Sequence, residues 1–327
     1  MKAIVIREFG EPDVLELRDI PEPECGPDDL LVAVRAAALN RADLLQRRGL
    51  YPAPEPKPAY DVPGLEYAGE VLRAGSRVLG FKPGDRVMGI LASGGYAERV
   101  VTHHRLAVRV PENLSWREAA AVPEAFITAH DALLQCGLAC GESVLIHAVG
   151  SGVGAAAVQV ASVMGATPVL GTAGSPEKLA AAKVLGLEIG IDYRNDDFVA
   201  ATKAATFGRG ADVIVDFIAA AYLDRNLQAL ATSGRMIVIG LLGGLAAELN
   251  LALLLAKRAT IRGTLLRSRS LEEKAAATRS FEKSVLPHLA SGRIRAVVDS
   301  VFEIERVVDA HRYMESNANF GKIVLEL

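Results

Sequence analysis

The sequence predicts an α/β protein in which a β-rich segment is followed by a doubly wound parallel sheet. Strand and helix patterns alternate from about residue 124, and such alternation is typical of doubly wound sheets. The strands of this part are continuous apolar runs, as expected for parallel strands buried on both faces. Three glycines, Gly150, Gly152 and Gly154, stand between one of these runs and a helix, so the turn there is the first candidate for a functional site.

Length and composition narrow the range of proteins that this chain can be. A chain of 327 residues is too long for one ordinary core, so we expect two domains. The net charge is −3 and no basic stripe is present, which gives nucleic-acid binding no electrostatic support. The three cysteines are too few for a disulfide framework, and this usage suits the cytoplasm. The start, "MKAIVIREFG", predicts a strand and not a signal peptide, because Arg7 and Glu8 break its apolar run.

The first 120 residues are expected to be mainly β-structure. Strand patterns such as "DLLVAVRAAAL", "AGEVLRAG" and "DRVMGI" alternate with turn sequences such as "ECGPDD" and "FKPGD". The proline-rich piece "YPAPEPKPAYDVPG", residues 51–64, predicts an extended loop. Ser115 and Glu118 have the spacing of a capping box, so a helix is expected to begin between them.

The parallel strands follow from residue 143 onward. They are "SVLIHAV", "TPVLGTA", "EIGIDY", "ADVIVDFI" and "GRMIVIG". The segment 236–256 is long and apolar enough to span a bilayer, but Gly240 and the pair Gly243-Gly244 interrupt it. We therefore expect a buried strand, a glycine-rich turn and a buried helix there, and no membrane partner. Residues 270–327 predict a helix, a strand, a second helix and a final strand that return to the first domain.

The glycine turn fits the pattern G-x-G-x-x-G/A, with Gly150, Gly152 and Ala155 at its small positions. The first small residue permits the turn, the second lets the backbone approach a pyrophosphate, and the third lets the helix pack on the strand. The helix start adds N–H groups and a partial positive charge that suit an anion. A lone glycine motif is weak evidence, but among four further strand–helix repeats it favours a dinucleotide site over a plain tight turn.

The residues after the second parallel strand indicate which dinucleotide would bind. An NAD site usually has an acid there, which binds the ribose hydroxyls. Here the strand is followed by Gly174 and Ser175, with Glu177 and Lys178 in the next helix. A missing acid with a hydroxyl and an ammonium nearby favours the 2′-phosphate of NADPH. Ser175 also suits a helix N-cap, which is compatible with that role, and Lys178 could be a solvated lysine. The alternative is that Glu177 reaches the ribose of NAD.

Several longer motifs occur in order along the chain. They are "AALNRADLLQRRGLYP", "VPGLEYAGEV", "GDRVMG", "AAAVPEAFITAHDAL", "SGVG", "LLRSR" and "NFGKIVLEL". With them the whole chain resembles the quinone oxidoreductase (zeta-crystallin-like) branch of the zinc-free medium-chain dehydrogenases. The resemblance implies a GroES-like β-rich catalytic domain over 1–123, an NADPH-binding Rossmann domain over 124–264 and a return to the catalytic domain over 265–327. It also implies a cleft at the domain junction, and with the apolar strand "GRMIVIG" it suggests a homodimer joined through the Rossmann domains.

Metal ligands of the zinc-dependent relatives are replaced in this chain. The corresponding places are 40–43 and 64–66, where Leu65 stands at the position of a ligand histidine and only Glu66 remains as a donor. Cys136 and Cys140 do not close a zinc site by themselves, and we expect them to be buried small apolar residues. The resemblance therefore implies a protein without bound zinc.

The resemblance also implies, position by position, which residues form the site. The expected cofactor-binding residues are Asn40, Thr128, Gly150, Ser151, Gly152, Val153, Gly174, Ser175, Lys178, Tyr193, Leu241, Phe320 and Lys322. Tyr51 and Asn40 are the expected catalytic residues, which would position the acceptor, and Tyr51 could donate a hydrogen bond to its oxygen. In purely structural terms, Tyr51 could anchor its loop, Asn40 could occupy a turn and Phe320 could pack in the core.

These expectations lead to a function. A protein without a metal has no Lewis acid to polarise an alcohol or carbonyl, whereas quinones and activated enones accept hydride readily. We predict an NADPH-dependent, metal-independent reductase of quinones or related α,β-unsaturated carbonyls. One alternative is an enoyl-thioester reductase, in which Arg41, Arg47 and Arg48 would attract an acyl carrier. Another is a low-turnover NADPH-binding structural or RNA-binding protein, and the balanced charge speaks against RNA binding.

Overall fold

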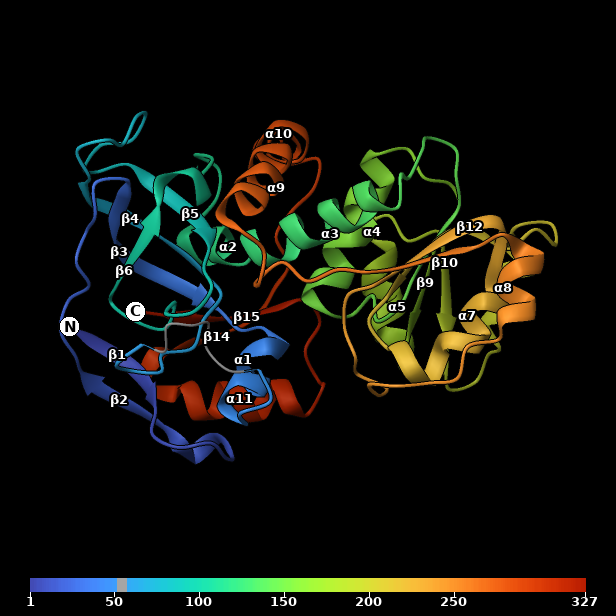
Figure 1. The fold of residues 1–327 in the computed structure, drawn as a ribbon, viewed down its shortest axis with the longest axis horizontal. Coiled ribbons are helices and arrows are strands. Elements are labelled where there is room, and N and C mark those ends of the chain that lie inside the picture. Colours follow the sequence, from blue (N-terminus) through green and yellow to red (C-terminus); the bar gives the residue numbers. More distant parts are fainter. Residues whose placement is uncertain (52–57) are drawn as a thin grey trace. The chain divides into compact units, whose positions relative to one another are not determined.

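The structure, a computed structural model, describes residues 1–51 and 58–327. The chain forms two compact units (Figure 1): the first comprises Met1–Ile127 and Arg267–Leu327, and the second Thr128–Leu266. The first boundary lies within one helix, α3 (Pro123–Gln135). Because this helix runs through the first boundary, no change in composition marks a linker there. The boundaries expected from the sequence lie after residues 123 and 264, a few residues before those of the structure, which lie after Ile127 and Leu266.

The first unit is β-rich. Its strands are β1 (Lys2–Ile6), β2 (Leu15–Asp19), β3 (Asp29–Ala38), β4 (Glu66–Ala74), β5 (Arg86–Ile90), β6 (Arg99–His103), β7 (Ala107–Arg109), β14 (Val298–Glu303) and β15 (Lys322–Glu326). Strands β1 and β2 pair with each other, and the others form a sheet in the order β14-β15-β3-β4-β5-β7, with β6 paired to β3. All pairs of this sheet are antiparallel except β14 with β15.

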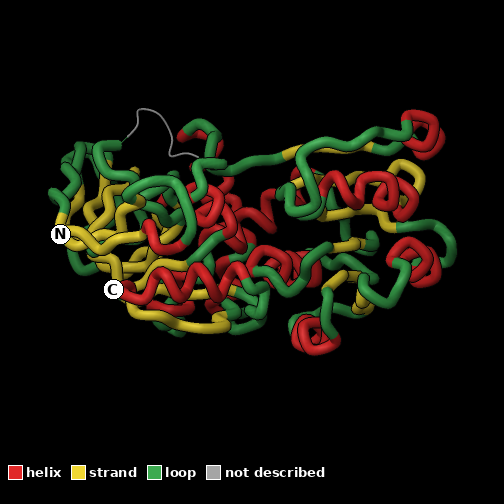
Figure 2. The backbone as a smooth tube through the Cα atoms, turned by 90° about the horizontal axis from the view of Figure 1, so that it is seen from below, coloured by secondary structure: helices red, strands yellow, loops and turns green. Residues whose placement is uncertain are grey.

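The end of the chain returns to this unit, as the sequence predicts. The C-terminal strand β15 pairs with β3, and Val324 lies opposite Ala38. In Figure 1 this pairing brings a red strand beside a blue one, and Figure 2 marks both termini in the same unit. The ends of β3 and β15 therefore lie close together, which places residues near 40 and near 322 at one site.

The helices of the first unit differ in length, and α9, with 14 residues, is the longest that lies wholly within it. They are α1 (Arg41–Arg47), α2 (Trp116–Ala120), the start of α3, α9 (Leu271–Ser284), α10 (Leu286–Ala290), α11 (Val307–Glu315) and the 3₁₀ turns η1 (Pro12–Val14), η2 (His104–Leu106) and η4 (Ile304–Arg306). The predicted capping box is confirmed: the Glu118 N–H donates to Ser115 Oγ at 3.3 Å, and the Ser115 N–H donates to Glu118 Oε2 at 2.9 Å. Part of the predicted loop 51–64 lies outside the described residues, and 58–64 form neither helix nor strand.

The second unit has the predicted doubly wound sheet. Its strands are β8 (Val144–Ile146), β9 (Val169–Ala173), β10 (Ile189–Asp192), β11 (Ala211–Asp216), β12 (Leu230–Val238) and β13 (Thr260–Gly263). All are parallel, in the order β10-β9-β8-β11-β12-β13. The chain order reverses beside β8, the first strand of the unit, and ligands of open α/β sheets bind outside the carboxyl ends of strands at such a point.

Helices α4 (Gly152–Val163), α5 (Pro176–Lys183), α6 (Phe198–Ala205), α7 (Leu223–Ala229) and α8 (Leu251–Lys257) connect these strands, with the 3₁₀ turn η3 (Ala219–Tyr222) before α7. Helix α4 packs on β8 and β9. Its alanines 155–157 are buried against the sheet, and small side chains let the helix backbone approach closely. This close packing fixes where the start of α4 points.

Two expectations about burial are wrong. Helix α8 was expected to be buried, but none of its residues is, and Leu251 and Leu255 are 61% and 76% exposed. Leu253 and Leu254 do pack on the core, and a run of leucines offers no polar face to show which side is exposed. Cys140 is also exposed, whereas Cys136 is buried as expected. Among the described residues no helix combines the length and the apolarity that crossing a membrane requires.

Candidate active site

A cluster of charged and amide side chains lies in the interior of the first unit, and we call it the Glu66 cluster. Its members are Asn40, Asp43, Glu66, Glu124 and Lys322, which stand at the ends of β3, β4 and β15 and at the starts of α1 and α3. Buried charges require partners, since burying an unpaired charge is costly. The fold supplies these partners from four segments that lie far apart in the sequence.

The ammonium group of Lys322 is the centre of the Glu66 cluster. Lys322 Nζ lies 2.6 Å from Glu66 Oε1, and it donates at 2.6 Å both to the carbonyl oxygen of Leu39 and to Asn40 Oδ1. The side chain of Lys322 is 5% exposed and that of Glu66 is not exposed at all. An ammonium has three donors, so the donors of Lys322 are matched by acceptors of the first unit.

Asn40 and Asp43 complete the same network. Asn40 Nδ2 donates to Glu66 Oε1 at 2.9 Å, and the Asn40 N–H donates to Asp43 Oδ2 at 2.7 Å. Tyr96 Oη donates to Asp43 Oδ2 at 2.9 Å. Burial raises the pKa of Asp43 to about 6, although these hydrogen bonds oppose the rise. The sequence prediction chose Asn40 and Lys322, and the structure places them in contact with each other.

Glu124 is a member of the cluster that the sequence analysis did not select. The Glu124 N–H, in the first turn of α3, donates to Glu66 Oε2 at 2.8 Å. The half-buried residue Glu124 therefore lies close to another acid. Burial, and then the charge of Glu66, raise the pKa of Glu124 to about 8. An acid in the first turn of a helix is usually explained by the helix dipole. For this reason Glu124 could not be recognised as a site residue from the sequence. At neutral pH the carboxyl group of Glu124 can therefore hold a proton.

Tyr51, one of the two predicted catalytic residues, is held by an arginine. The guanidinium carbon of Arg267 lies 4.4 Å from the centre of the Tyr51 ring, and Arg267 Nη1 donates to the Tyr51 carbonyl oxygen at 3.0 Å. Burial raises the pKa of Tyr51, while the charge of Arg267 lowers it. Arg267 was part of the motif "LLRSR" in the sequence, but no local pattern showed that it would meet Tyr51.

In the second unit the glycine turn lies at the carboxyl end of β8. Ser151 caps α4, because its Oγ accepts a hydrogen bond from the Gly154 N–H at 3.0 Å. A Cβ atom at Gly154 would overlap the carbonyl oxygen of Ala148, so this position must be glycine. Gly152 and Val153 form the first turn of the helix, where backbone N–H groups have no acceptor within the helix. The turn therefore has the backbone of an anion-binding site.

The residues predicted to bind the phosphates form two close pairs, one of them at the glycine turn. A Cβ atom on Gly150 would lie 2.8 Å from Cδ of Lys178, so the lysine side chain crosses the glycine turn. Ser175 caps α5, and the Lys178 N–H donates to its Oγ at 3.3 Å. A Cβ atom on Gly174 would lie 2.5 Å from the hydroxyl of Tyr193. The structure thus brings Lys178 to Gly150, and Tyr193 to Gly174.

The remaining predicted residues are divided between the units. Thr128 is buried, and its hydroxyl has no hydrogen-bond partner among the described residues. Leu241 is 53% exposed in the second unit. Phe320 is half-buried in the first unit, where its N–H donates to Asp299 Oδ1 at 2.8 Å. Asn40, Tyr51, Phe320 and Lys322 thus belong to the first unit and the other predicted residues to the second.

A buried polar network supports the glycine turn from within the second unit. His147 follows β8, and its ring nitrogens hydrogen-bond to Thr172 Oγ1 at 3.0 Å and Asn226 Oδ1 at 2.8 Å. Asn226 Nδ2 donates in turn to Asp216 Oδ2 at 3.0 Å. Burial lowers the pKa of His147 and keeps the ring neutral. The sequence analysis missed this network, because its members come from different strands and a helix that are far apart in the sequence.

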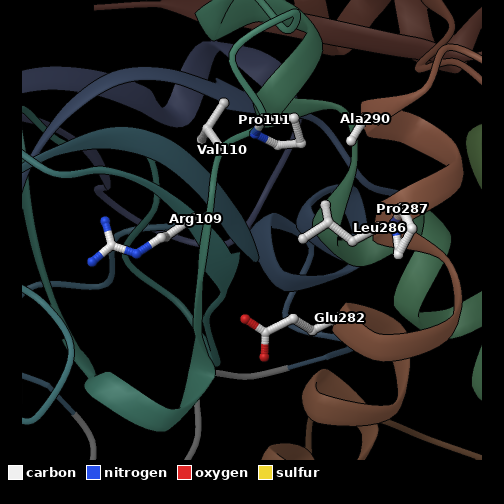
Figure 3. A pocket seen from close by; sticks show the side chains of 7 residues that line it. All are labelled: Arg109, Val110, Pro111, Glu282, Leu286, Pro287 and Ala290. Atoms are coloured by element: carbon white, nitrogen blue, oxygen red, sulfur yellow. The ribbon is translucent and has the colours of Figure 1, made fainter.

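One surface cavity lies elsewhere in the first unit. It has a volume of about 310 Å³ and is lined by Arg109, Val110, Pro111, Glu282, Leu286, Pro287 and Ala290. In Figure 3 the guanidinium group of Arg109 points away from the apolar side chains. That group is bound to Gly80 and Asp85. None of the predicted site residues lines this cavity, so it is not the candidate site.

The predicted absence of zinc stays a prediction. Leu65, at the position of a ligand histidine, is 2% exposed and packs in the core. Glu66 is bound to Asn40 and Lys322. Within residues 1–51 and 58–327, no three or more His, Cys, Asp or Glu side chains are grouped so that they could hold a metal ion.

Comparisons with known proteins agree with this architecture. Residues 26–112 match the family described as alcohol dehydrogenase GroES-like domain, and residues 152–282 match zinc-binding dehydrogenase. A quinone oxidoreductase of Lama guanicoe is 34% identical over 331 residues, which cover 100% of this chain and 98% of that protein. A solved NAD-dependent alcohol dehydrogenase has a TM-score of 0.88 at 33% identity, and the Escherichia coli quinone oxidoreductase complexed with NADPH has 0.89 at 28%. Both structural matches cover 100% of each chain.

Proposed function

We propose that this protein reduces quinones or related α,β-unsaturated carbonyls with NADPH. The chain belongs to the quinone oxidoreductase branch of the medium-chain dehydrogenases, and this membership supports the proposal. The observation that carries the proposal is the glycine turn at the reversal point of the parallel sheet, with Lys178 across it. Such a turn is suited to a dinucleotide, and the lysine adds a positive charge beside it.

The chain's own residues must decide between the two dinucleotides, because one similar structure is NAD-dependent and another holds NADPH. Lys178 and Ser175 are proposed to bind the 2′-phosphate, with Gly174 and Tyr193 beside them. Glu177 is exposed, and its pKa is lowered by hydrogen bonds to its own N–H and to Ser175. A carboxylate held at the start of α5 fits a helix-stabilising role better than a ribose contact.

The rest of the cofactor is proposed to bind as follows. Gly150, Ser151, Gly152 and Val153 would hold the pyrophosphate through backbone N–H groups at the start of α4. Thr128 has a buried hydroxyl without a partner among the described residues, which suits a contact with the cofactor. The remaining proposed contacts are Asn40, Leu241, Phe320 and Lys322. When bound, the cofactor supplies the hydride.

Residues of the first unit are proposed to bind the acceptor. Tyr51 would donate a hydrogen bond from its phenol to the acceptor oxygen, since its raised pKa keeps the phenol protonated at neutral pH. Asn40 would act beside it, held in place by Glu66 and Lys322. Neither role requires a metal, so we propose that the reaction is zinc-independent. Elemental analysis that finds about one zinc per chain, with activity lost to a chelator, would contradict this.

The proposal is tested by following NADPH absorbance with three acceptors: a quinone, an enone and a crotonyl thioester. We expect rapid oxidation with the quinone or the enone and slow oxidation with the thioester. Preference for the thioester would instead identify an enoyl-thioester reductase. Tight binding of NADPH without turnover on any acceptor would identify a cofactor-binding protein that is not an enzyme of this class.

We also propose that the protein forms a homodimer through its second unit. Strand β13 is an edge of the parallel sheet, and exposed leucines lie before it in sequence. Leu245, Leu251 and Leu255 are 85%, 61% and 76% exposed. An open sheet edge with apolar side chains nearby is a typical association surface. Sedimentation should give a dimer for the wild type and a monomer for Leu255→Glu, and a monomeric wild type would contradict the proposal.

A further inference from the structure

Arg267 makes several directed contacts within the first unit, and one of them is with Tyr51 on the proposed acceptor side. Its Nε donates to the carbonyl oxygen of Ala92 at 2.6 Å, and its Nη2 donates to Gln46 Oε1 at 3.0 Å. Its Nη1 donates to the carbonyl oxygen of Tyr51 at 3.0 Å. The residue is 9% exposed. A buried guanidinium thus joins three separate segments of the first unit.

The contact with Tyr51 involves both its backbone and its ring. While Nη1 binds the carbonyl oxygen, the guanidinium carbon lies 4.4 Å from the ring centre, within the range of a cation–π contact. A residue held at its carbonyl alone could still turn its ring about χ1. Because the same group also covers the ring, the contact restricts the ring as well as the backbone.

Gln46 keeps the arginine itself in place. While its Oε1 accepts from Arg267, Gln46 Nε2 donates to Asp61 Oδ1 at 2.6 Å and to Ser93 Oγ at 3.0 Å. Gln46 is fully buried at the end of α1, so the arginine is anchored to a helix and not only to loops. A chain of contacts therefore runs from α1 through Arg267 to the Tyr51 ring.

We propose that Arg267 is the positioning residue of Tyr51, which aims the phenol at the oxygen of the acceptor. This inference rests on the proposed function, in which Tyr51 donates a hydrogen bond to the acceptor. Arg267 acts through Tyr51 and touches neither acceptor nor hydride in this role. It is a residue that determines how well the acceptor is oriented.

Only an arginine fits this arrangement. Its planar fork directs five N–H donors and can stack on a ring at the same time, whereas a lysine offers one compact ammonium. Arg267→Lys would keep the charge but could not reach Ala92, Tyr51 and Gln46 together. The conservative substitution therefore separates the geometry of the guanidinium from its charge.

The supporting electrostatics are consistent with a donating phenol. Burial raises the pKa of Tyr51, while the charge of Arg267 and its hydrogen bond to the Tyr51 side chain lower it. The net result is a phenol that keeps its proton at neutral pH. Arg267 can therefore orient the hydroxyl without ionising it.

The first part of the test is a kinetic cycle of Arg267→Lys and Tyr51→Phe with a quinone as acceptor. If Arg267 acts by aiming the Tyr51 hydroxyl, Arg267→Lys should lower kcat/KM by about tenfold, the scale of one lost hydrogen bond. In the Tyr51→Phe background the same change should have almost no effect, and the Kd for NADPH should stay the same. Equal losses in both backgrounds would overturn the proposal. The matched control is Arg293→Lys, since Arg293 is exposed.

The second part does not depend on turnover. Tyrosines labelled with ¹³C at Cζ are observed by NMR, and the Tyr51 signal is assigned by its loss in Tyr51→Phe. Arg267→Lys should shift or broaden that signal, while Arg293→Lys should leave it unchanged. An unshifted Tyr51 signal would overturn the proposal even in an active enzyme, whereas a wild type without turnover on any acceptor would instead contradict the proposed function. If Arg267→Lys does not fold, Arg267→Gln replaces it in both parts.

Discussion

The two units of this chain build their candidate binding residues in opposite ways. In the first unit the candidate residues are linked to charged and polar side chains that bind one another in the interior, such as Lys322 with Glu66 and Arg267 with Gln46. In the second unit the centre of the site is backbone: a glycine turn and the start of a helix made of small residues. The interior of the second unit does contain His147, but burial keeps that ring neutral.

This difference indicates which kind of substitution each unit should be sensitive to. In the proposed function a pyrophosphate would be bound by backbone N–H groups, which every residue except proline has, so the second unit would depend on the absence of side-chain atoms. In the same proposal an acceptor oxygen would be bound by particular side chains, so the first unit would have to hold polar groups in an apolar interior, where they need partners. Removing a side chain should therefore damage the first unit, and adding one should damage the second.

The largest expected effect is on the stability of the first unit. Lys322→Met would leave the fully buried carboxylate of Glu66 without its ion-pair partner, and removing one partner of a buried pair costs about 3–5 kcal/mol. Urea unfolding should show this loss. The double variant Lys322→Met/Glu66→Met should recover much of it, while Lys2→Met, on the exposed side of β1, should change little. If Lys322→Met lowered the free energy of unfolding by less than about 1 kcal/mol, the first unit would not depend on its buried ion pair, and the contrast with the second unit would fail.

A smaller loss is expected when an atom is added to the second unit. Gly154→Ala would force a Cβ atom against the carbonyl oxygen of Ala148, and overpacking of this kind costs about 1–3 kcal/mol. Because the start of α4 would shift, the affinity for NADPH should fall as well. Gly263→Ala is the matched control, since a Cβ atom there meets no atom within 4 Å. Unchanged unfolding and unchanged NADPH titration in Gly154→Ala would show that the turn is not sterically restricted.

Glu124 is expected to make a pH-dependent contribution to the free energy of unfolding. Its pKa is raised in the folded protein from 4.5 to about 8, so between these values the folded protein holds a proton that the unfolded chain has lost. The free energy of unfolding should therefore fall as the pH rises through this range, by at most about 1.4 kcal/mol per pH unit. Asp43 adds to this slope only below about pH 6.

Thermal unfolding between pH 5 and pH 9 checks this contribution. Glu124→Gln should unfold at nearly the same temperature as the wild type at the acid end, and at a higher temperature at the alkaline end. Glu112→Gln, on an exposed carboxyl group, is the control and should follow the wild type throughout. A constant difference between Glu124→Gln and the wild type across the range would mean that Glu124 does not titrate there.

The same contrast explains what could be predicted from the sequence. The parallel sheet, the glycine turn and the cap at Ser175 were predictable, because each depends on residues that are close together in the chain. The contacts of Glu124 with Glu66, 58 residues apart, and of Arg267 with Tyr51, 216 residues apart, exist only after folding. No local pattern shows such pairs.

Burial of apolar residues was the other weak point of the prediction. The leucines of α8 have the composition of a core helix, but the sheet edge beside them leaves Leu251 and Leu255 exposed. Cys140 is exposed for a related reason: it lies in the turns before β8, where the chain follows the surface. Composition tells which residues favour burial, but the number of elements available to cover them is a property of the folded chain.

The cofactor assignment is tested most directly by titrating NADPH and NADH into the wild type, Lys178→Ala and Glu177→Ala. A hydrogen bond to a charged group contributes about 1.5–3 kcal/mol, so Lys178→Ala should bind NADPH about tenfold to a hundredfold more weakly. Its affinity for NADH should hardly change, because NADH has no 2′-phosphate, and Glu177→Ala should behave like the wild type. A wild type that prefers NADH, or a Lys178→Ala variant that loses affinity equally for both cofactors, would contradict the assignment.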